Sequence, residues 1–254
     1  MFRNRTDAHP SAMTRLYLVL LIGVLTSVPA WAQPTLTAVS FRATFDATLD
    51  ADLADGRPTP KAVDGNVGYD TGRYGQALVA GEDGAGVSYR IERNLDTRKG
   101  ALSFWFLPVD WTPGELRAHL FVHSPFAGIF RILNDEAGQL VFEIGTDLGQ
   151  RRRVSAPLAN CPRGKWVHVA VNWSAEALEL FLNGKAVAKT PCEARFLPRI
   201  VNSNFVVGDL PHARGREAVR KTLIDDLTIY RRPLGAGELG RVEAATGGKM
   251  PAYR

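Results

Sequence analysis

The sequence predicts an all-β fold in which two antiparallel sheets stack face to face, with one short helix near the C-terminus. Runs in which apolar and polar residues alternate recur through most of the chain, as in strands that bury one face. Gly, Pro, Asn and Asp separate these runs and favour turns. Only residues 237–245, after Pro233, have a persuasive helical pattern. About a dozen strands with so little helix exclude a βαβ fold and leave two stacked sheets.

The expected strands of the first half of the chain lie between residues 36 and 144. The runs ALSFWFLPV at 101–109 and LVFEI at 140–144 are the clearest, because they combine alternation with β-branched and aromatic residues. The complete set covers residues 36–45, 86–91, 101–109, 117–123, 129–133 and 140–144.

The second half of the chain predicts a central hairpin and a closing strand. In the run 166–173, Val167, Val169, Val171 and Trp173 share one face. Strands at 178–182 and 185–188 flank Asn183-Gly184, which favours a two-residue type I′ turn. Residues 223–230 form the last expected strand, before the helix at 237–245.

Residues 1–32 have the composition of a secretory signal peptide. An uncharged apolar run at 16–28 follows Arg15 and precedes Ala30-Trp31-Ala32, which is typical of a cleavage site before Gln33. The alternative is an uncleaved anchor, but thirteen residues of helix span only about 20 Å of a ~30 Å hydrocarbon core. We therefore expect a secreted or periplasmic protein that has no stable membrane span after cleavage. Residues 33–254 contain no repeat or break in composition and are expected to form a single domain.

The charge of the chain says little about its partners. The formal net charge is +5, and it falls to +3 without the first 32 residues, which hold three arginines and one aspartate. Basic clusters at 151–153 and 214–221 suit either sulfated or uronic acid polymers or plain solvent exposure. Nucleic acid is not expected, because no stacking aromatics accompany these arginines in an exported chain.

Cys161 and Cys192 are the only cysteines of the chain. In an oxidising compartment they predict one disulfide across the central hairpin, and two free thiols are the alternative. No neighbouring Cys or His completes a zinc site.

Segments that arrive in a fixed order resemble the motifs of one family. They are FDATLD at 45–50, GRYGQAL at 72–78, LSFWFLP at 102–108, the hairpin KWVHVAV–LELFLNGK between 165 and 185, and IDDLTIYRRPL at 224–234. On these motifs the chain resembles the concanavalin A-like lectin/glucanase superfamily, in its laminin G-like, pentraxin-related branch. The resemblance implies a jelly-roll β-sandwich, a fold that carries lectins, adhesion modules, hydrolases and lyases.

The sequence lacks the catalytic signature of the family's hydrolases. These enzymes carry E-x-D-x-x-E on one strand, which aims its carboxylates at one face, and no such triplet occurs here. We therefore expect a non-catalytic module that binds a polysaccharide, another glycan or a cell-surface protein. The alternative is a polysaccharide hydrolase or lyase whose atypical site combines His119, His123, Arg131 and Glu143.

The resemblance also implies one calcium ion, held at the sandwich rim by Asp46 and Asp225. Calcium prefers six to eight oxygen ligands and tolerates loop geometry. The alternative for Asp225 is that it accepts N–H groups of a loop or pairs with an arginine.

The ligand candidates lie on the sheet face that sugar-binding relatives use. Strict alternation places His119, Phe121 and His123 on one face, with Arg131 and Glu143 on neighbouring strands. The two histidines lie about 13 Å apart, too far to share a metal ion, but they can line a polar groove. The alternative is a half-buried face of packing residues.

A tryptophan outside the expected strands is the last ligand candidate. Trp111 follows a strand and precedes Thr112-Pro113-Gly114, so it lies in a loop where it can stack on a sugar ring. The alternative is that it covers the end of the sandwich.

Overall fold

A computed structural model describes the fold at residues 38–81, 85–114, 119–124, 128–158, 161–200, 202–208 and 220–245. The chain divides into the units 1–33 and 34–254, and every described residue belongs to the second. The leader predicted at 1–32 lies outside the described residues.

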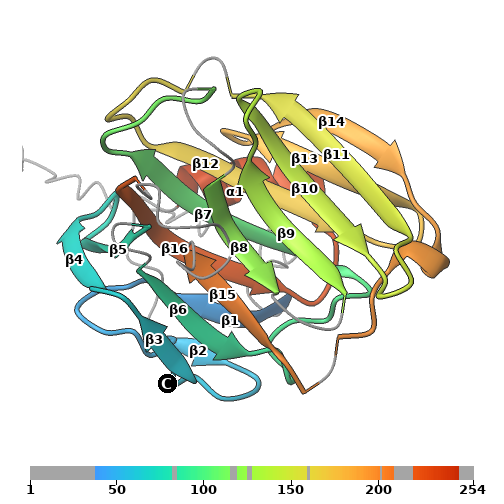
Figure 1. Cartoon of the computed structure of the whole chain (residues 1–254), viewed down its shortest axis with the longest axis horizontal. Coiled ribbons are helices and arrows are strands. Elements are labelled where there is room, and N and C mark those ends of the chain that lie inside the picture. The colour runs from blue at the N-terminus through green and yellow to red at the C-terminus, as the bar shows by residue number, and fades with distance from the viewer. Residues whose placement is uncertain are drawn as a thin grey trace, which may run out of the picture. The chain divides into compact units, whose positions relative to one another are not determined.

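The larger sheet contains nine of the described strands (Figure 1). Its path runs β14-β13-β12-β7-β16-β1-β2, and β5 joins β16 and carries β4. The bounds are β1 Val39–Ala43, β2 Leu53–Ala54, β4 Gly68–Thr71, β5 Gln76–Ala80, β7 Gly100–Pro108, β12 Val167–Trp173, β13 Ala177–Leu182, β14 Lys185–Pro191 and β16 Thr222–Tyr230.

The smaller sheet contains seven described strands in the order β11-β10-β9-β8-β15-β6-β3. The bounds are β3 Ala62–Asp64, β6 Gly86–Arg90, β8 His119–Ser124, β9 Ile129–Asn134, β10 Gln139–Gly145, β11 Arg151–Pro157 and β15 Asn204–Gly208. A 3-10 turn, η4, covers Ala194–Phe196, and one α-helix, α1, covers Ala236–Ala245. All the pairings within the described sheets are antiparallel, as the alternating pattern predicts.

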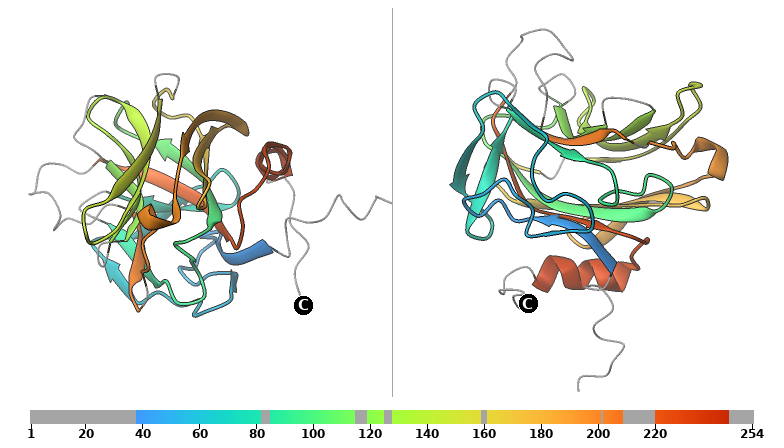
Figure 2. Two further views of the ribbon diagram at one scale, coloured as in Figure 1. Left: turned by 90° about the vertical axis from the view of Figure 1, so that its right-hand side faces the viewer. Right: turned by 90° about the horizontal axis from the view of Figure 1, so that it is seen from below.

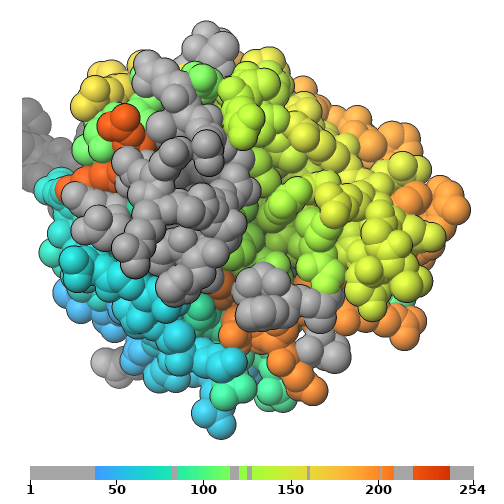
Figure 3. Space-filling model, in the orientation of Figure 1, coloured from blue at the N-terminus to red at the C-terminus, as the bar shows by residue number. Residues whose placement is uncertain are grey.

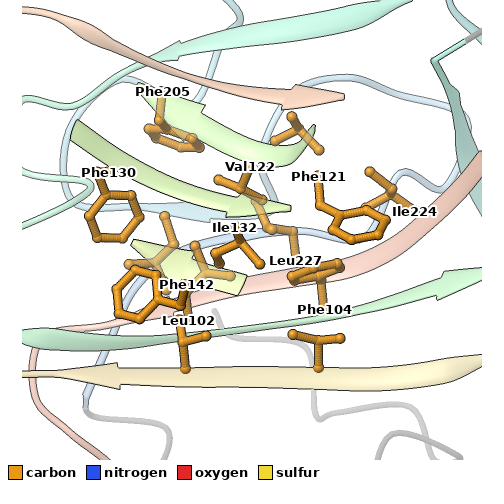
Figure 4. Close-up of a cluster of buried hydrophobic side chains, with 14 of the residues drawn as sticks. Leu102, Phe104, Phe121, Val122, Phe130, Ile132, Phe142, Phe205, Ile224 and Leu227 are labelled. Atoms are coloured by element: carbon orange, nitrogen blue, oxygen red, sulfur yellow. The ribbon is translucent and has the colours of Figure 1, made fainter. Parts of the chain in front are cut away.

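The two sheets enclose one apolar core. Figure 2 shows them as stacked layers, and Figure 4 shows side chains of both sheets pointing toward each other between the layers. Phe104 of β7 and Phe142 of β10 are fully buried there, as is Trp173 of β12. Helix α1 lies on the outer side of the larger sheet, where Leu239 packs against Ala170 and neighbouring apolar residues. The predicted sandwich with one short C-terminal helix is confirmed.

The central hairpin also forms as predicted. Asn183 and Gly184 have φ of 47° and 71°, the positive values that a type I′ turn requires. The Asn183 side-chain oxygen accepts the His168 N–H at 3.0 Å and so fixes the turn to β12. No helix in the described ranges is long and apolar enough to cross a membrane.

The predicted disulfide is absent. Cys161 and Cys192 are both buried free thiols, which pack in the main core as small apolar side chains do. Burial raises the pKa of both thiols, that of Cys161 to about 11. The Cys192 thiol donates to the carbonyl of Glu193 at 3.6 Å.

Candidate functional site

A β-bulge in β8 decides which predicted ligand residues reach the outer face of the smaller sheet. The register of β8 against β9 shifts between Leu120 and Val122, so that Phe121 and Val122 both lie in the core. Phe121 is fully buried, and its prediction as a ligand residue is wrong because the bulge breaks strict alternation. His119 lies opposite Asn134, but its side chain lies outside what the structure describes.

Three of the predicted residues do come together on this outer face, which Figure 3 views directly. His123 lies opposite Arg131, and Arg131 lies opposite Glu143, on three neighbouring strands. The Arg131 Nε donates to Glu143 Oε2 at 2.6 Å, and Arg151 Nη1 lies 3.9 Å from Oε1. We call His123, Arg131, Glu143 and Arg151 the ionic strip.

The ionic strip does not have the arrangement of a glycosidase acid–base pair. Its carboxylate, Glu143, already accepts hydrogen bonds from an arginine. Asp135 is paired with Arg153 at 2.5 Å and lies four residues beyond Arg131, about 13 Å along the strand. Catalytic carboxyl pairs lie about 5 to 9.5 Å apart. The strip is therefore an ion-pair network around a buried carboxylate, with its arginines partly exposed at the surface.

The basic cluster at 151–153 is divided by alternation along β11. Arg151 and Arg153 face Glu143 and Asp135, whereas the guanidinium of Arg152 lies over the ring of Phe196, 3.9 Å from its centroid. The cluster therefore does not present three free cations on one face. Most of the second cluster, at 214–221, lies outside the described residues, which resume at 220.

Trp111 covers the end of the sandwich from inside, so its prediction as a sugar-stacking residue is wrong. It is 1% exposed, and its ring lies nearly parallel to that of Phe106 at 6.3 Å. Its Nε1 donates to Thr222 Oγ1 at 2.9 Å. The loop after β7 folds inward, because a large apolar ring gains more from burial than from exposure.

The two predicted calcium ligands meet at one turn, residues 72–76. Asp225 Oδ2 accepts the Tyr74 N–H at 2.9 Å, and Asp46 Oδ1 accepts the Gln76 N–H at 2.8 Å. A Cβ at position 75 would lie 2.0 Å from Asp46 Oδ1, and Gly75 has φ of 56°. The turn therefore needs glycine to wrap closely around these carboxylates. This is the loop-binding alternative predicted for Asp225.

Asp225 keeps one buried oxygen, Oδ1, without a hydrogen-bond partner. Burial raises the pKa of this carboxyl to about 7. In the part of the chain that the structure describes, no group of three His, Cys, Asp or Glu residues lies close enough to hold a metal ion. Asp46 and Asp225 alone do not make a calcium shell, so calcium stays a prediction for which backbone carbonyls would supply most ligands.

A pocket at the sandwich rim brings together residues that the sequence did not single out. It measures about 500 Å³ and lies where β6 ends and β15 begins. Two segments line it, residues 91–98 after β6 and residues 199–202 before β15. The first segment contributes Arg93 and Arg98, and the second contributes Arg199. Isolated arginines far apart in the sequence form no local motif, so sequence patterns could not reveal them.

Comparisons with solved structures find the same fold in toxin binding domains. The botulinum neurotoxin serotype D binding domain matches with a TM-score of 0.68 at 12% identity, over 83% of this chain and 52% of that one. The binding domain of Paraclostridial Mosquitocidal Protein 1 matches with a TM-score of 0.65 at 15% identity, over 82% and 52%. The chain thus spans about half the length of these structures, and at this identity the likeness shows the fold alone.

No curated protein matches the sequence. The family model that does match, Laminin_G_3, covers residues 80–240, well over half of the chain. This range includes both sides of the sandwich, from the end of β5 to α1. The chain therefore belongs to the concanavalin A-like lectin/glucanases superfamily, in its laminin G-like branch.

Proposed function

We propose that this protein is an exported, non-catalytic binding module that recognises a glycan or a cell-surface protein. The observation that carries the proposal is the state of the carboxylates on the outer face of the smaller sheet. Glu143 and Asp135 are each held by arginines, so neither is placed as a free acid or base. A face on which both of these described carboxylates are already paired is better suited to binding than to acid–base chemistry.

The neighbouring structures support the same proposal. They are binding and receptor-binding domains of toxins, and they share the two-sheet architecture. The leader expected at residues 1–32 would bring such a module to the periplasm or the exterior, where glycans and surface proteins are available.

The test is retention of the purified protein by a panel of neutral and acidic polysaccharides and by cell-envelope fractions. Each is measured with calcium and with EDTA, and reducing ends are assayed in parallel. We expect retention by at least one fraction without release of reducing ends. Failure of every fraction to retain the protein, or cleavage of a retained polysaccharide, would overturn the proposal.

A further inference from the structure

The rim pocket is built from two chain segments that are fixed to each other. The Ile91 N–H donates to the carbonyl of Ser203 at 3.0 Å, and Thr97 Oγ1 donates to the carbonyl of Pro198 at 2.7 Å. Figure 1 shows the two segments side by side where β6 ends and β15 begins. Because these hydrogen bonds hold the two segments together, the pocket is formed before any ligand binds. Less conformational entropy of the loops is then lost on binding.

The pocket combines an apolar floor with a charged mouth. Ile91, Leu95 and Ile200 line it and are 2–3% exposed. Arg93, Arg98 and Arg199 line it with exposed side chains. An apolar floor suits the C–H face of a sugar ring, while guanidinium groups suit an anion.

These three arginines differ from most other arginines in the described part of the chain. Arg131, Arg153 and Arg231 each pair with a carboxylate within 4 Å. In the described ranges, none of Arg93, Arg98 and Arg199 makes a salt bridge or a side-chain hydrogen bond. Three guanidinium groups at one pocket are therefore available to an anionic ligand.

Two acidic residues, Glu92 and Asp96, also line the pocket. Asp96 Oδ1 accepts the backbone N–H of Arg98 at 2.9 Å, which holds the loop and leaves Oδ2 for another donor. Carboxylates next to arginines would repel a densely charged anion, but they can accept hydrogen bonds from hydroxyl groups. Donors for an anion beside acceptors for hydroxyls match a sugar acid with one carboxylate per ring.

The backbone at the pocket is strained. Arg93 and Asn202 have φ of 64° and 55°, in the left-handed region. Asn tolerates this region, but for Arg it is uncommon, and glycine would relieve the strain. Strained residues of this kind gather at ligand sites, where the surrounding structure holds them in place.

We propose that the rim pocket binds a uronic acid residue of an acidic polysaccharide, with its carboxylate between Arg93, Arg98 and Arg199. This proposal rests on the proposed binding function, and it names the ligand class and the place where that ligand binds. The pocket volume of about 500 Å³ falls within the range of small-molecule sites.

The experiment measures binding of oligosaccharides of galacturonate, mannuronate and glucuronate by calorimetry. The methyl esters of the same oligosaccharides serve as uncharged matches, and inorganic sulfate serves as the simple anion. We expect at least one acidic oligosaccharide to bind, and its ester to bind roughly tenfold more weakly or not at all. Added salt should weaken the binding of the acid, because charged hydrogen bonds to Arg provide the affinity. Equal binding of acid and ester, or displacement of the acid by millimolar sulfate, would overturn the proposal.

Variants separate binding from folding. Arg98→Gln and Arg199→Gln should each weaken the binding of the acidic oligosaccharide about tenfold and leave the thermal midpoint of the protein unchanged. Arg93→Gly should also weaken it while keeping or raising the midpoint, because strain at φ of 64° is removed. Lys185→Gln, which removes an exposed cation at the distant β13–β14 turn, is the matched control and should bind normally.

The outcomes distinguish failure of the pocket assignment from failure of the proposed binding function. Retention of a neutral glycan or an envelope protein without binding of any uronic acid would overturn the pocket assignment and leave the binding function intact. Retention of nothing would overturn both. Full affinity in all three arginine variants would also overturn the pocket assignment.

Discussion

Asp225 shows how a single buried carboxyl couples this fold to pH. Its side chain is 1% exposed, accepts the Tyr74 N–H through Oδ2 and leaves Oδ1 without a partner. Burial is the main cause that raises its pKa from 3.8 to about 7, with the neighbouring charge of Asp226 as a smaller cause. The folded state therefore binds this proton more tightly than the unfolded state does.

The first prediction concerns stability between pH 4 and pH 8. Because the folded pKa is raised, the folded protein holds more protons in this window, and the free energy of unfolding falls as pH rises from about 4 to 7. The full effect is roughly 4 kcal/mol. Asp225→Asn keeps an acceptor for Tyr74 and should remove most of this slope and raise stability at pH 8, as measured by urea unfolding. An unchanged slope in the variant would refute the assignment.

The same variant decides whether calcium binds here. An ion that binds only the folded protein raises its stability in proportion to RT ln(1 + [L]/Kd). If calcium occupies Asp225 Oδ1, excess calcium at pH 8 should raise the thermal midpoint of the native sequence by several degrees and leave Asp225→Asn unmoved. The absence of a shift in the native sequence would leave both aspartates with the structural role of holding the turn at 72–76.

At the scale of the element, that turn depends on glycine. Gly75→Ala would place a Cβ 2.0 Å from Asp46 Oδ1 at φ of 56°, so we expect a loss of about 2–4 kcal/mol in urea unfolding. Gly149→Ala is the matched control, because Gly149 has φ of 80° with nothing within 4 Å of the new Cβ, and should cost about 1 kcal/mol. Adding Asp46→Ala to the Gly75→Ala variant should recover part of the stability that Gly75→Ala loses beyond the loss at Gly149→Ala. Equal losses at the two glycines would contradict the close approach.

The ionic strip across β9–β11 gives a further prediction. Glu143→Gln removes a carboxylate that is buried, with 8% of the residue exposed, and takes its charge away from the partly exposed Arg131 and Arg151. We therefore expect a loss of about 1–3 kcal/mol in urea unfolding, because arginine donors lose a buried charged acceptor. Retention on polysaccharides should be unchanged, whereas abolition of a measurable polysaccharide cleavage by this variant would favour the hydrolase or lyase alternative.

The strands that the sequence predicted well are those with one continuous apolar face. The runs at 101–109 and 166–173 became β7 and β12 with nearly the same bounds. The strand β11 was missed because it lies at the sheet edge, where polar side chains are tolerated on both faces. Alternation also failed for Phe121, since the bulge gives β8 one extra residue and leaves Phe121 and Val122 both facing the core.

At the scale of the whole molecule, the fold was more predictable than the candidate sites. Family motifs lie in strands and turns that shape the sandwich, and they identified the turn at 72–76 together with both of its aspartates. The rim pocket depends on loops that meet only after folding, so Arg93 and Arg199 carried no signal in the sequence. Trp111 was ambiguous for the same reason, because burial of a loop residue is decided by its distant neighbours.

The two core thiols give this protein a built-in reporter of its own opening. A thiolate is the species that maleimides attack, and burial holds the pKa of Cys161 near 11 and also raises that of Cys192. At pH 7 we expect rapid labelling in urea and very slow labelling of the native protein, detected by mass spectrometry. Equally fast labelling in both would contradict the burial. Because modification of the native protein then requires opening of the core, the ratio of the labelling rate in the native state to that in urea measures the free energy of that opening. No engineered probe is needed.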